Sequence, residues 1–320
     1  MDFTKYIEGF KERDKRLIAR AISIIETESK GHEFLLDKIF HLTGKAYRIG
    51  ITGPPGAGKS TITNQLAKKL TSQNNSVGII AVDPTSPFTG GALLGDRVRM
   101  SDLTNNKDVF IRSMASRGSL GGLNEKASDI ADVLDASGFD FIIFETVGVG
   151  QSELEIVKTA DTTIVAVVPE SGDSIQAMKA GLMEIADVFV MNKSDRPGSE
   201  QAVAALKAML TFRWHDENTW IPEVVKTVGT ENKGIEELLQ AILVHKNHLE
   251  EKNLLSQKRQ ERHLQRIRNI VETKIMGELW SNIVGDDKNA ALSSYSPVPP
   301  YNLAEKLITD YKKHIRRGDD

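Results

Sequence analysis

Short apolar runs alternate with amphipathic segments through the central part of the chain. Seven of these runs are rich in apolar residues, and most are nearly continuously apolar, which is typical of strands buried on both faces of a parallel sheet. They cover residues 47–52, 77–82, 109–113, 140–145, 162–168, 187–191 and 221–227. Helical patterns lie between most of them. We therefore predict a three-layer α/β/α fold with a mostly parallel sheet, joined by right-handed crossovers.

Both ends of the chain have a helical pattern instead. The first 44 residues predict two helices, at 15–28 and 33–42. Residues 246–284 are highly charged, contain no proline and carry an apolar stripe, which predicts one or two long helices. Such a stripe fits either a solvated helix face or a contact between subunits. A loop at 285–300 and a short helix at 303–315 complete the chain.

These patterns divide the sequence into three parts. We expect an N-terminal helical extension at 1–44, a central α/β domain at 45–245 and a C-terminal helical arm at 246–320. The chain has 320 residues, which is ample for a sizeable core.

Charge and composition exclude several classes of protein. The formal net charge is −3, so bulk electrostatics favour neither nucleic acid nor a membrane surface as a partner. The chain has no cysteine, which excludes disulfides and thiolate metal sites. No apolar stretch approaches the roughly 18 residues of a membrane span, and the first residues lack a signal-peptide pattern. We expect a cytoplasmic protein.

A glycine-rich loop follows the first predicted strand and precedes a predicted helix at 60–70. It has the spacing G-x-x-x-x-G-K-S and consists of Gly53, Pro54, Pro55, Gly56, Ala57, Gly58, Lys59, Ser60 and Thr61. Backbone N–H groups of such a loop wrap phosphates, and the helix N-terminus favours the same anion. Lys59 is then expected to reach the outer phosphates, and the Ser60 hydroxyl to bind Mg²⁺. A chance glycine-rich turn is the alternative.

A second motif predicts which base is bound. Asn192, Lys193 and Asp195 form N-K-x-D at the end of the strand at 187–191. A carboxylate there accepts two N–H bonds from guanine but meets an acceptor on adenine, which discriminates by about 10⁴ or more. A helix cap or turn is the alternative for a motif this short. A backbone N–H at Val228 or Gly229 is expected to complete the guanine pocket.

The segment after the fourth strand predicts slow hydrolysis. Glu145 lies where it can hold Mg²⁺ through water, and Gly148 can offer its N–H to the γ-phosphate. Ras-like GTPases have glutamine after this glycine, where it orients the attacking water, but this chain has Val149. Gln151 is the only nearby substitute that we consider. We expect fast turnover only with a partner that remodels the site.

Two further segments follow strand ends on the same rim of the predicted sheet. Asp83 and Asp96 are candidate ligands of Mg²⁺ or its waters, since Mg²⁺ takes oxygen donors. A helix-capping role is the alternative for both, and a surface charge is the alternative for the neighbouring Arg99. Asp173 and Lys179 lie in the second of these segments: Asp173 is a candidate switch residue or a helix cap, and Lys179 a candidate switch residue or a solvated charge.

Two histidines, three residues apart in the sequence, are candidate metal ligands. His245 and His248 have no cysteine pair or adjacent carboxylate in the sequence. We therefore expect surface residues rather than zinc ligands.

With these motifs in order, the sequence resembles the MeaB/ArgK family of methylmalonyl-CoA mutase-associated GTPases, which includes the MMAA-type proteins. The motifs that carry the resemblance are Ala81 to Pro87, Gly90 to Met100, Glu145 to Glu153 and Gly172 to Gly181. The resemblance implies a SIMIBI-class P-loop GTPase that binds GTP or GDP with Mg²⁺ and forms a homodimer through its C-terminal arm.

The resemblance also implies a function and roles for residues. It implies a chaperone that gates adenosylcobalamin delivery to an acyl-CoA mutase and protects it, with a cobalamin adenosyltransferase as a further partner. Ser60, Asp83, Asp96 and Glu145 would surround Mg²⁺. The following residues would act in catalysis or switching: Lys59, Asp96, Arg99, Glu145, Gly148, Gln151, Asp173, Gln176 and Lys179.

The sequence departs from the family pattern at two places, and three other functions stay open. Thr227-Val228-Gly229 replaces Thr-Ser-Ala, and the link at 285–300 is longer than usual.

A metallochaperone GTPase for nickel would need a Cys/His metal site, and the absence of cysteine argues against that function. A small-molecule kinase is the second alternative, and an older label of the family is arginine/ornithine transport kinase. Such a kinase would need a residue other than Asp195 to recognise its base. A scaffold that binds GTP without hydrolysing it is the third.

Overall fold

The computed structural model describes residues 4–84, 100–116, 120–146, 158–169, 182–211, 219–283 and 299–317. The chain divides into two compact units, Met1–Lys258 and Arg259–Asp320. Residue 245, the predicted end of the central α/β domain, lies inside a helix of the first unit.

A single seven-stranded sheet forms the centre of the first unit, in the order β3-β2-β4-β1-β5-β6-β7. Every strand pairs with its neighbours in parallel. The strands are β1 (Tyr47–Thr52), β2 (Val77–Pro84), β3 (Val109–Ser116), β4 (Phe141–Glu145), β5 (Thr162–Val167), β6 (Val188–Asn192) and β7 (Glu223–Thr227). Each of the seven apolar runs therefore forms a strand, and the predicted fold class is confirmed.

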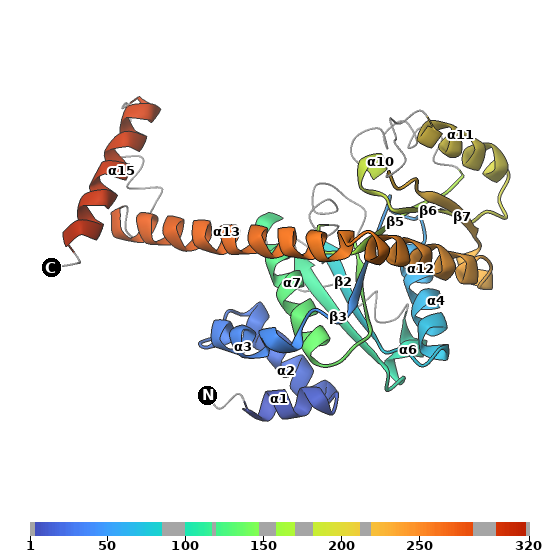
Figure 1. Cartoon of the computed structure of the whole chain (residues 1–320), viewed down its shortest axis with the longest axis horizontal. Helices are drawn as coiled ribbons and strands as arrows, with labels where there is room; N and C mark the ends of the chain where they lie inside the picture. Colours follow the sequence, from blue (N-terminus) through green and yellow to red (C-terminus); the bar gives the residue numbers. More distant parts are fainter. Residues whose placement is uncertain are drawn as a thin grey trace. The chain divides into compact units, whose positions relative to one another are not determined.

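Helices cover both faces of the sheet (Figure 1). Alternate side chains of each strand point to opposite faces, so Ile143 packs with α4 (Lys59–Ser72) and α12 (Ile235–Glu251), whereas Ile142 and Phe144 pack with α7 (Leu120–Ala136). Helices α10 (Leu182–Ile185) and α11 (Ser199–Thr211) pack on β5 and β6. The helices of this unit are α1 (Thr4–Lys11), α2 (Lys15–Glu26), α3 (His32–Ile39), η1 (Phe40–Leu42), α4 (Lys59–Ser72), α6 (Ser101–Thr104), α7 (Leu120–Ala136), α10 (Leu182–Ile185), α11 (Ser199–Thr211), η2 (Gly229–Glu231) and α12 (Ile235–Glu251).

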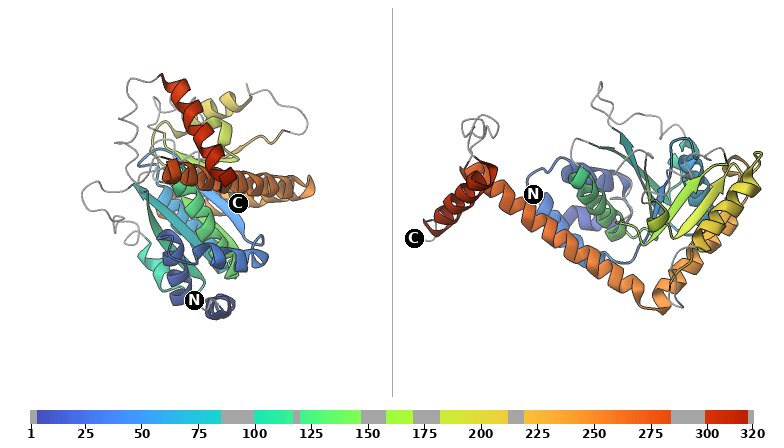
Figure 2. Two further views of the ribbon diagram at one scale, coloured as in Figure 1. Left: turned by 90° about the vertical axis from the view of Figure 1, so that its left-hand side faces the viewer. Right: turned by 90° about the horizontal axis from the view of Figure 1, so that it is seen from above.

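The N-terminal helices belong to the core of the first unit. Phe10, Ile22, Leu35 and Ile39 are fully buried, in one hydrophobic cluster with side chains of α7, β2, β3 and β4. Figure 2 shows these helices, in dark blue, beside the green α7. The extension therefore covers apolar surface that the sheet layer would otherwise expose to water.

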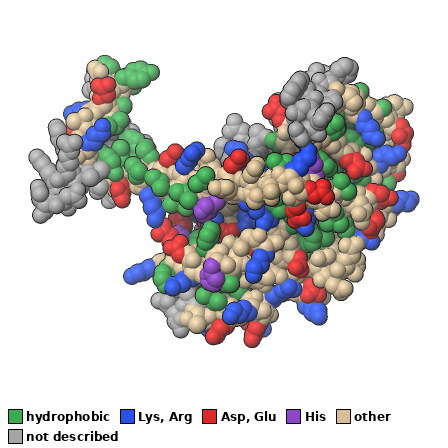
Figure 3. Space-filling model, in the orientation of Figure 1, with side chains coloured by type: hydrophobic (Ala, Val, Ile, Leu, Met, Phe, Trp, Pro, Cys, Tyr) green, Lys and Arg blue, Asp and Glu red, His purple; other side chains and the backbone are tan. Residues whose placement is uncertain are grey.

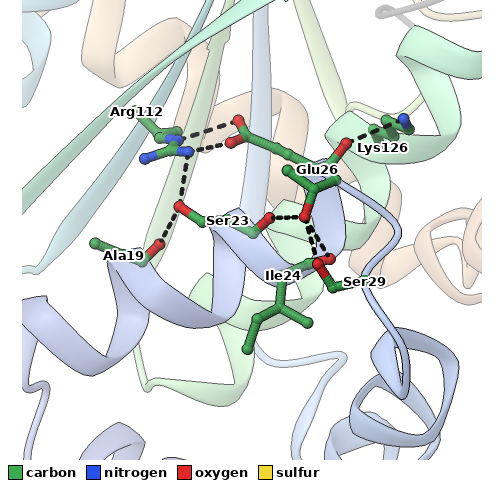
Figure 4. Close-up of polar contacts among 8 residues, drawn as sticks. Ala19, Ser23, Ile24, Glu26, Ser29, Arg112 and Lys126 are labelled. Atoms are coloured by element: carbon green, nitrogen blue, oxygen red, sulfur yellow. Dashed lines mark hydrogen bonds and ion pairs between the residues drawn. The ribbon is translucent and has the colours of Figure 1, made fainter.

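Polar contacts fix the end of α2 to the sheet (Figure 4). Arg112 of β3 donates from Nε to Glu26 Oε1 at 3.1 Å, and its Nη2 donates to the other carboxylate oxygen and to Ser23 Oγ at 3.2 Å. Lys126 of α7 donates to the Glu26 carbonyl at 3.2 Å. A cation at a helix C-terminus is favourable because the last carbonyls carry partial negative charge.

The expectation that His245 lies at the surface is wrong. Its ring is 1% exposed, its Nδ1 lies 2.8 Å from Thr162 Oγ1, and its Nε2 lies 3.4 Å from the Asp187 carboxylate. The Trp220 ring packs 4.7 Å away. Burial lowers the pKa of His245 to about 4 despite the opposing charge of Asp187. The imidazole is therefore neutral at physiological pH and serves as a core residue.

The second unit is helical. Its described residues belong to α13 (Leu254–Ile283), which begins before the boundary, and α15 (Pro300–Arg317). Tyr311 donates its hydroxyl to Glu278 at 3.3 Å. Among the described residues of the chain, no helix combines the length and apolar character needed to cross a membrane.

Candidate functional site

The predicted motifs meet at the carboxyl ends of the parallel strands. Strand β1 ends at Thr52 and leads into the glycine-rich loop, while β4 ends at Glu145. On the other side of β1, β6 ends at Asn192, which is paired with Thr227 at the end of β7. Ligands of open α/β sheets bind at this edge.

Two glycines of the loop have no room for a side chain. Gly53 has φ +134°, and a Cβ there would lie 2.0 Å from the Ala166 carbonyl oxygen. Gly58 has φ +87°, and a Cβ there would lie 2.2 Å from Asn192 Nδ2. Both conformations lie in the region that favours glycine. The loop is therefore held against β5 and against the base-reading motif.

Lys59 opens helix α4 and is buried, with 6% of its surface exposed. Its Nζ donates to the carbonyls of Gly53 at 2.8 Å and Pro54 at 3.1 Å. The ammonium group is thus held over the loop, next to the N-terminus of a helix of 14 residues. A helix N-terminus and an ammonium group together attract phosphate.

Ser60 and Glu145 lie together although 85 positions separate them. The Ser60 hydroxyl donates to Glu145 Oε1, and the Glu145 residue is 5% exposed. Asp83 is the second-last residue of β2, two strands from β1 in the sheet order. A hydroxyl and a carboxylate are the oxygen donors that Mg²⁺ takes in proteins, so this pair fits the predicted metal.

Asn192 connects three segments of the site. Its Nδ2 donates to the Ala57 carbonyl at 2.8 Å, and its Oδ1 accepts from Thr227 Oγ1 at 3.0 Å and from the Gly229 N–H at 3.1 Å. The side chain is buried and makes these contacts within the protein. The sequence analysis names Thr227 as part of the altered Thr-Val-Gly motif but predicts no role for its side chain, which the structure places against Asn192.

The turn after Asn192 presents Asp195 to solvent. Lys193 has φ +56°, and the Ser194 N–H donates to the Thr227 carbonyl at 3.0 Å. This places Asp195 in an exposed position next to the carboxyl end of β7. An exposed carboxylate at a strand end is available to a base.

Lys233 is a neighbour of this carboxylate that the sequence did not reveal. A hydrogen bond to Glu231, with the charge of that carboxylate, raises the pKa of Lys233, and the charge of Asp195 adds to the effect. The Lys233 ammonium group, which is charged at neutral pH without this shift, is therefore a cation near the predicted guanine reader.

Both backbone N–H groups assigned to the guanine pocket have partners within the protein. The Val228 N–H donates to the Lys233 carbonyl at 3.1 Å, and the Gly229 N–H donates to Asn192. A base contact through either group would have to replace or share that bond. The structure places these two residues beside Asn192, and their contact with a base stays a prediction.

Seven of the predicted site residues lie outside the described residues, so their positions are not part of this geometry. They are Asp96, Arg99, Gly148, Gln151, Asp173, Gln176 and Lys179. The Asp83 side chain is likewise outside the described part, although its backbone belongs to β2.

Comparison with known proteins agrees with this arrangement. Residues 18–283 match the protein family described as Methylmalonyl Co-A mutase-associated GTPase MeaB. The chain belongs to the MeaB family. It is a GTPase with the P-loop fold, and the resemblance drawn from its motifs is confirmed.

The relatives of this MeaB-family chain are similar over most of their length. A Pyrococcus abyssi protein named as a GTPase is 46% identical over 309 residues, which cover 95% of each chain. The Escherichia coli GTPase ArgK is 35% identical over 283 residues, which cover 86% of each chain. The mouse methylmalonic aciduria type A homolog, a mitochondrial protein, is 31% identical over 84% of this chain and 69% of its own.

A solved structure supports the fold of the family member. The crystal structure of an LAO/AO transport system kinase aligns with a TM-score of 0.73 at 27% identity, covering 98% of this chain and 97% of that one. The kinase activity in that description belongs to that protein.

Proposed function

We propose that this GTPase is a chaperone that gates adenosylcobalamin delivery to, and protects, an acyl-CoA mutase of the methylmalonyl-CoA type. The observation that carries the proposal is the family match, which spans the phosphate loop, N-K-x-D and the sheet between them. We further propose that it works in the cytoplasm as a homodimer, and that a cobalamin adenosyltransferase is a second partner.

The described side chains have distinct roles in this proposal. Lys59 and the N-terminus of α4 bind the phosphates of GTP, and Asp195 accepts hydrogen bonds from guanine. Ser60 and Glu145, with Asp83 and Asp96, hold Mg²⁺ directly or through water. When bound, Mg²⁺ would neutralise part of the negative charge of the phosphates. The glycine-rich loop at 53–61 would hold the γ-phosphate in position for attack by water. Gly148 and Gln151 are the proposed neighbours of the γ-phosphate and of that water.

Hydrolysis by the purified protein is expected to be slow. Valine at position 149 offers no hydrogen bond to orient water, so turnover should fall well below the roughly 1–100 s⁻¹ typical of kinases. Phosphate release from saturating GTP and Mg²⁺ measures this rate. Lys59→Ala, which removes the phosphate-binding cation, is the control for contaminating activity. A rate inside that range without a partner would refute the argument from Val149.

The client is tested with the same protein. Capture from a lysate of the source, followed by transfer of adenosylcobalamin to the captured mutase, should depend on GTP and fail with Lys59→Ala. We propose Asp173, Gln176 and Lys179 as switch residues that sense the mutase, with Arg99 as a further one. Transfer at the same rate with no nucleotide would contradict gating by GTP.

An exposed apolar stripe on α13 supports the proposed dimer. Six large hydrophobic side chains of this helix are each 41–48% exposed: Leu264, Ile267, Ile270, Val271, Ile275 and Met276. Figure 3 shows hydrophobic side chains, in green, along this arm. Among the described residues of the second unit, Leu307 is the only buried hydrophobic one. A second copy of the arm would remove this surface from water.

Removing residues 259–320 is therefore expected to give monomers. The cut leaves α12 and the first turn of α13 in place, where Lys258 donates to the Asp161 carbonyl at 2.9 Å. Light scattering of the full chain and the truncated chain measures the change, and GTP binding by the truncated chain is the control for folding. A truncated protein that is still a dimer would discard the arm as the interface.

A further inference from the structure

One contact in the site joins α4, the helix that begins at Lys59, to the loop after β7. Gln65, on α4, donates from Nε2 to the Gly229 carbonyl at 3.2 Å. Gln65 lies six residues after Lys59, on the same helix, and its side chain is partly buried. Nothing in the motif assignments above gives this glutamine a role.

The contact fixes Gly229 from a second side. Its N–H is bound by Asn192 and its carbonyl by Gln65. A Cβ at Gly229 would lie 3.2 Å from the Thr61 methyl group, so the loop backbone is also close to the first turn of α4. The Gln65 bond and this close approach therefore hold the start of η2 against the helix that opens with Lys59 and Ser60, while the Asn192 bond holds it to the end of β6.

We propose that Gln65 is a positioning residue that sets how long a guanine nucleotide stays bound. This rests on the proposed guanine site, because the argument needs the phosphates at the start of α4 and the base between Asp195 and the loop at 228–229. A nucleotide held at both ends leaves more slowly when the elements that hold those ends are bonded to each other. Gln65 supplies a direct side-chain bond of this kind between α4 and Gly229.

The dissociation rate of a fluorescent GDP analogue, chased with excess GDP, tests the proposal. Gln65→Ala removes one hydrogen bond of ordinary strength, so dissociation should become about five-fold faster. Gln65→Glu keeps the length of the side chain but faces the carbonyl with acceptors, so it should be at least as fast as alanine. Gln65→Lys restores an N–H donor of sufficient reach and should return the rate toward that of the unchanged protein.

The matched control is Gln73→Ala, which removes an exposed glutamine just after the end of the same helix and should leave the rate unchanged. Equal rates for Gln65→Ala and the unchanged protein would overturn the inference while leaving GTP binding intact. The inference would also be overturned if Gln65→Lys did not restore the rate and all three Gln65 variants had lowered melting temperatures. That result would show that the substitutions destabilise the fold in general. If the unchanged protein binds no GDP analogue, the proposed function itself fails.

Discussion

Asp195→Asn is expected to turn the preference of this GTPase from GTP towards XTP. The carboxylate of Asp195 accepts hydrogen bonds from N1–H and the 2-amino group of guanine. Xanthine carries an oxygen in place of that amino group, so an amide, which both donates and accepts, matches it. The ratio of the two affinities should change by about 10⁴ or more, because a polar group that the bound base buries and leaves unpaired is costly. Asp195 is exposed in the free protein, so the change should not affect folding.

Competition by GTP, XTP and ATP against a fluorescent GDP analogue measures that ratio. Glu200→Gln is the matched control, since it also removes one exposed carboxylate charge nearby. Glu200 pairs with Lys226 at 2.7 Å on the surface, and such pairs contribute little. Unchanged GTP affinity in the asparagine variant would remove Asp195 from the base site.

The strands could be predicted from the sequence because their physical signal is local. A central parallel strand buries both faces, so it is an apolar run whatever its neighbours are. The run at 47–52 coincides with β1, and the run at 77–82 forms β2, which extends further to Pro84. The phosphate loop was equally accessible, because its glycines and Lys59 are consecutive in the chain.

Contacts between distant positions had no such signal. Gln65 and Gly229 are 164 positions apart, and only the pairing of strands brings them together. His245 was assigned to the surface because its partners Thr162 and Asp187 are far away in the sequence. A polar residue buried by tertiary contacts cannot be distinguished from an exposed one by local pattern alone.

The largest effect on stability is expected from Asp135→Ala, at the connection between the N-terminal helices and β1. Asp135 is 2% exposed and accepts the N–H groups of Gly44 at 2.8 Å, Lys45 at 3.1 Å and Ala46 at 3.0 Å. Arg48 Nη2 also lies 3.7 Å from its carboxylate. These contacts fix the chain at the entry to β1, the strand that leads into the phosphate loop.

Alanine at position 135 would leave the buried Ala46 N–H without this acceptor. It would also remove one of the two carboxylates beside the Arg48 guanidinium and leave the other, Asp132, at 2.7 Å. Since a lost partner of a buried donor or charge costs about 1–3 kcal/mol, the two losses should lower the free energy of unfolding by about 3 kcal/mol. For a unit of this size that corresponds to a fall of roughly 6–12 °C in melting temperature.

Asp37→Ala, on the exposed face of α3, is the control and should stay within about 0.5 kcal/mol. Asp135→Asn keeps one acceptor oxygen without the charge, so its melting temperature should lie between those of the alanine variant and the unchanged protein. If alanine at position 135 costs no more than alanine at position 37, the contacts of Asp135 do not stabilise the connection between the N-terminal helices and β1.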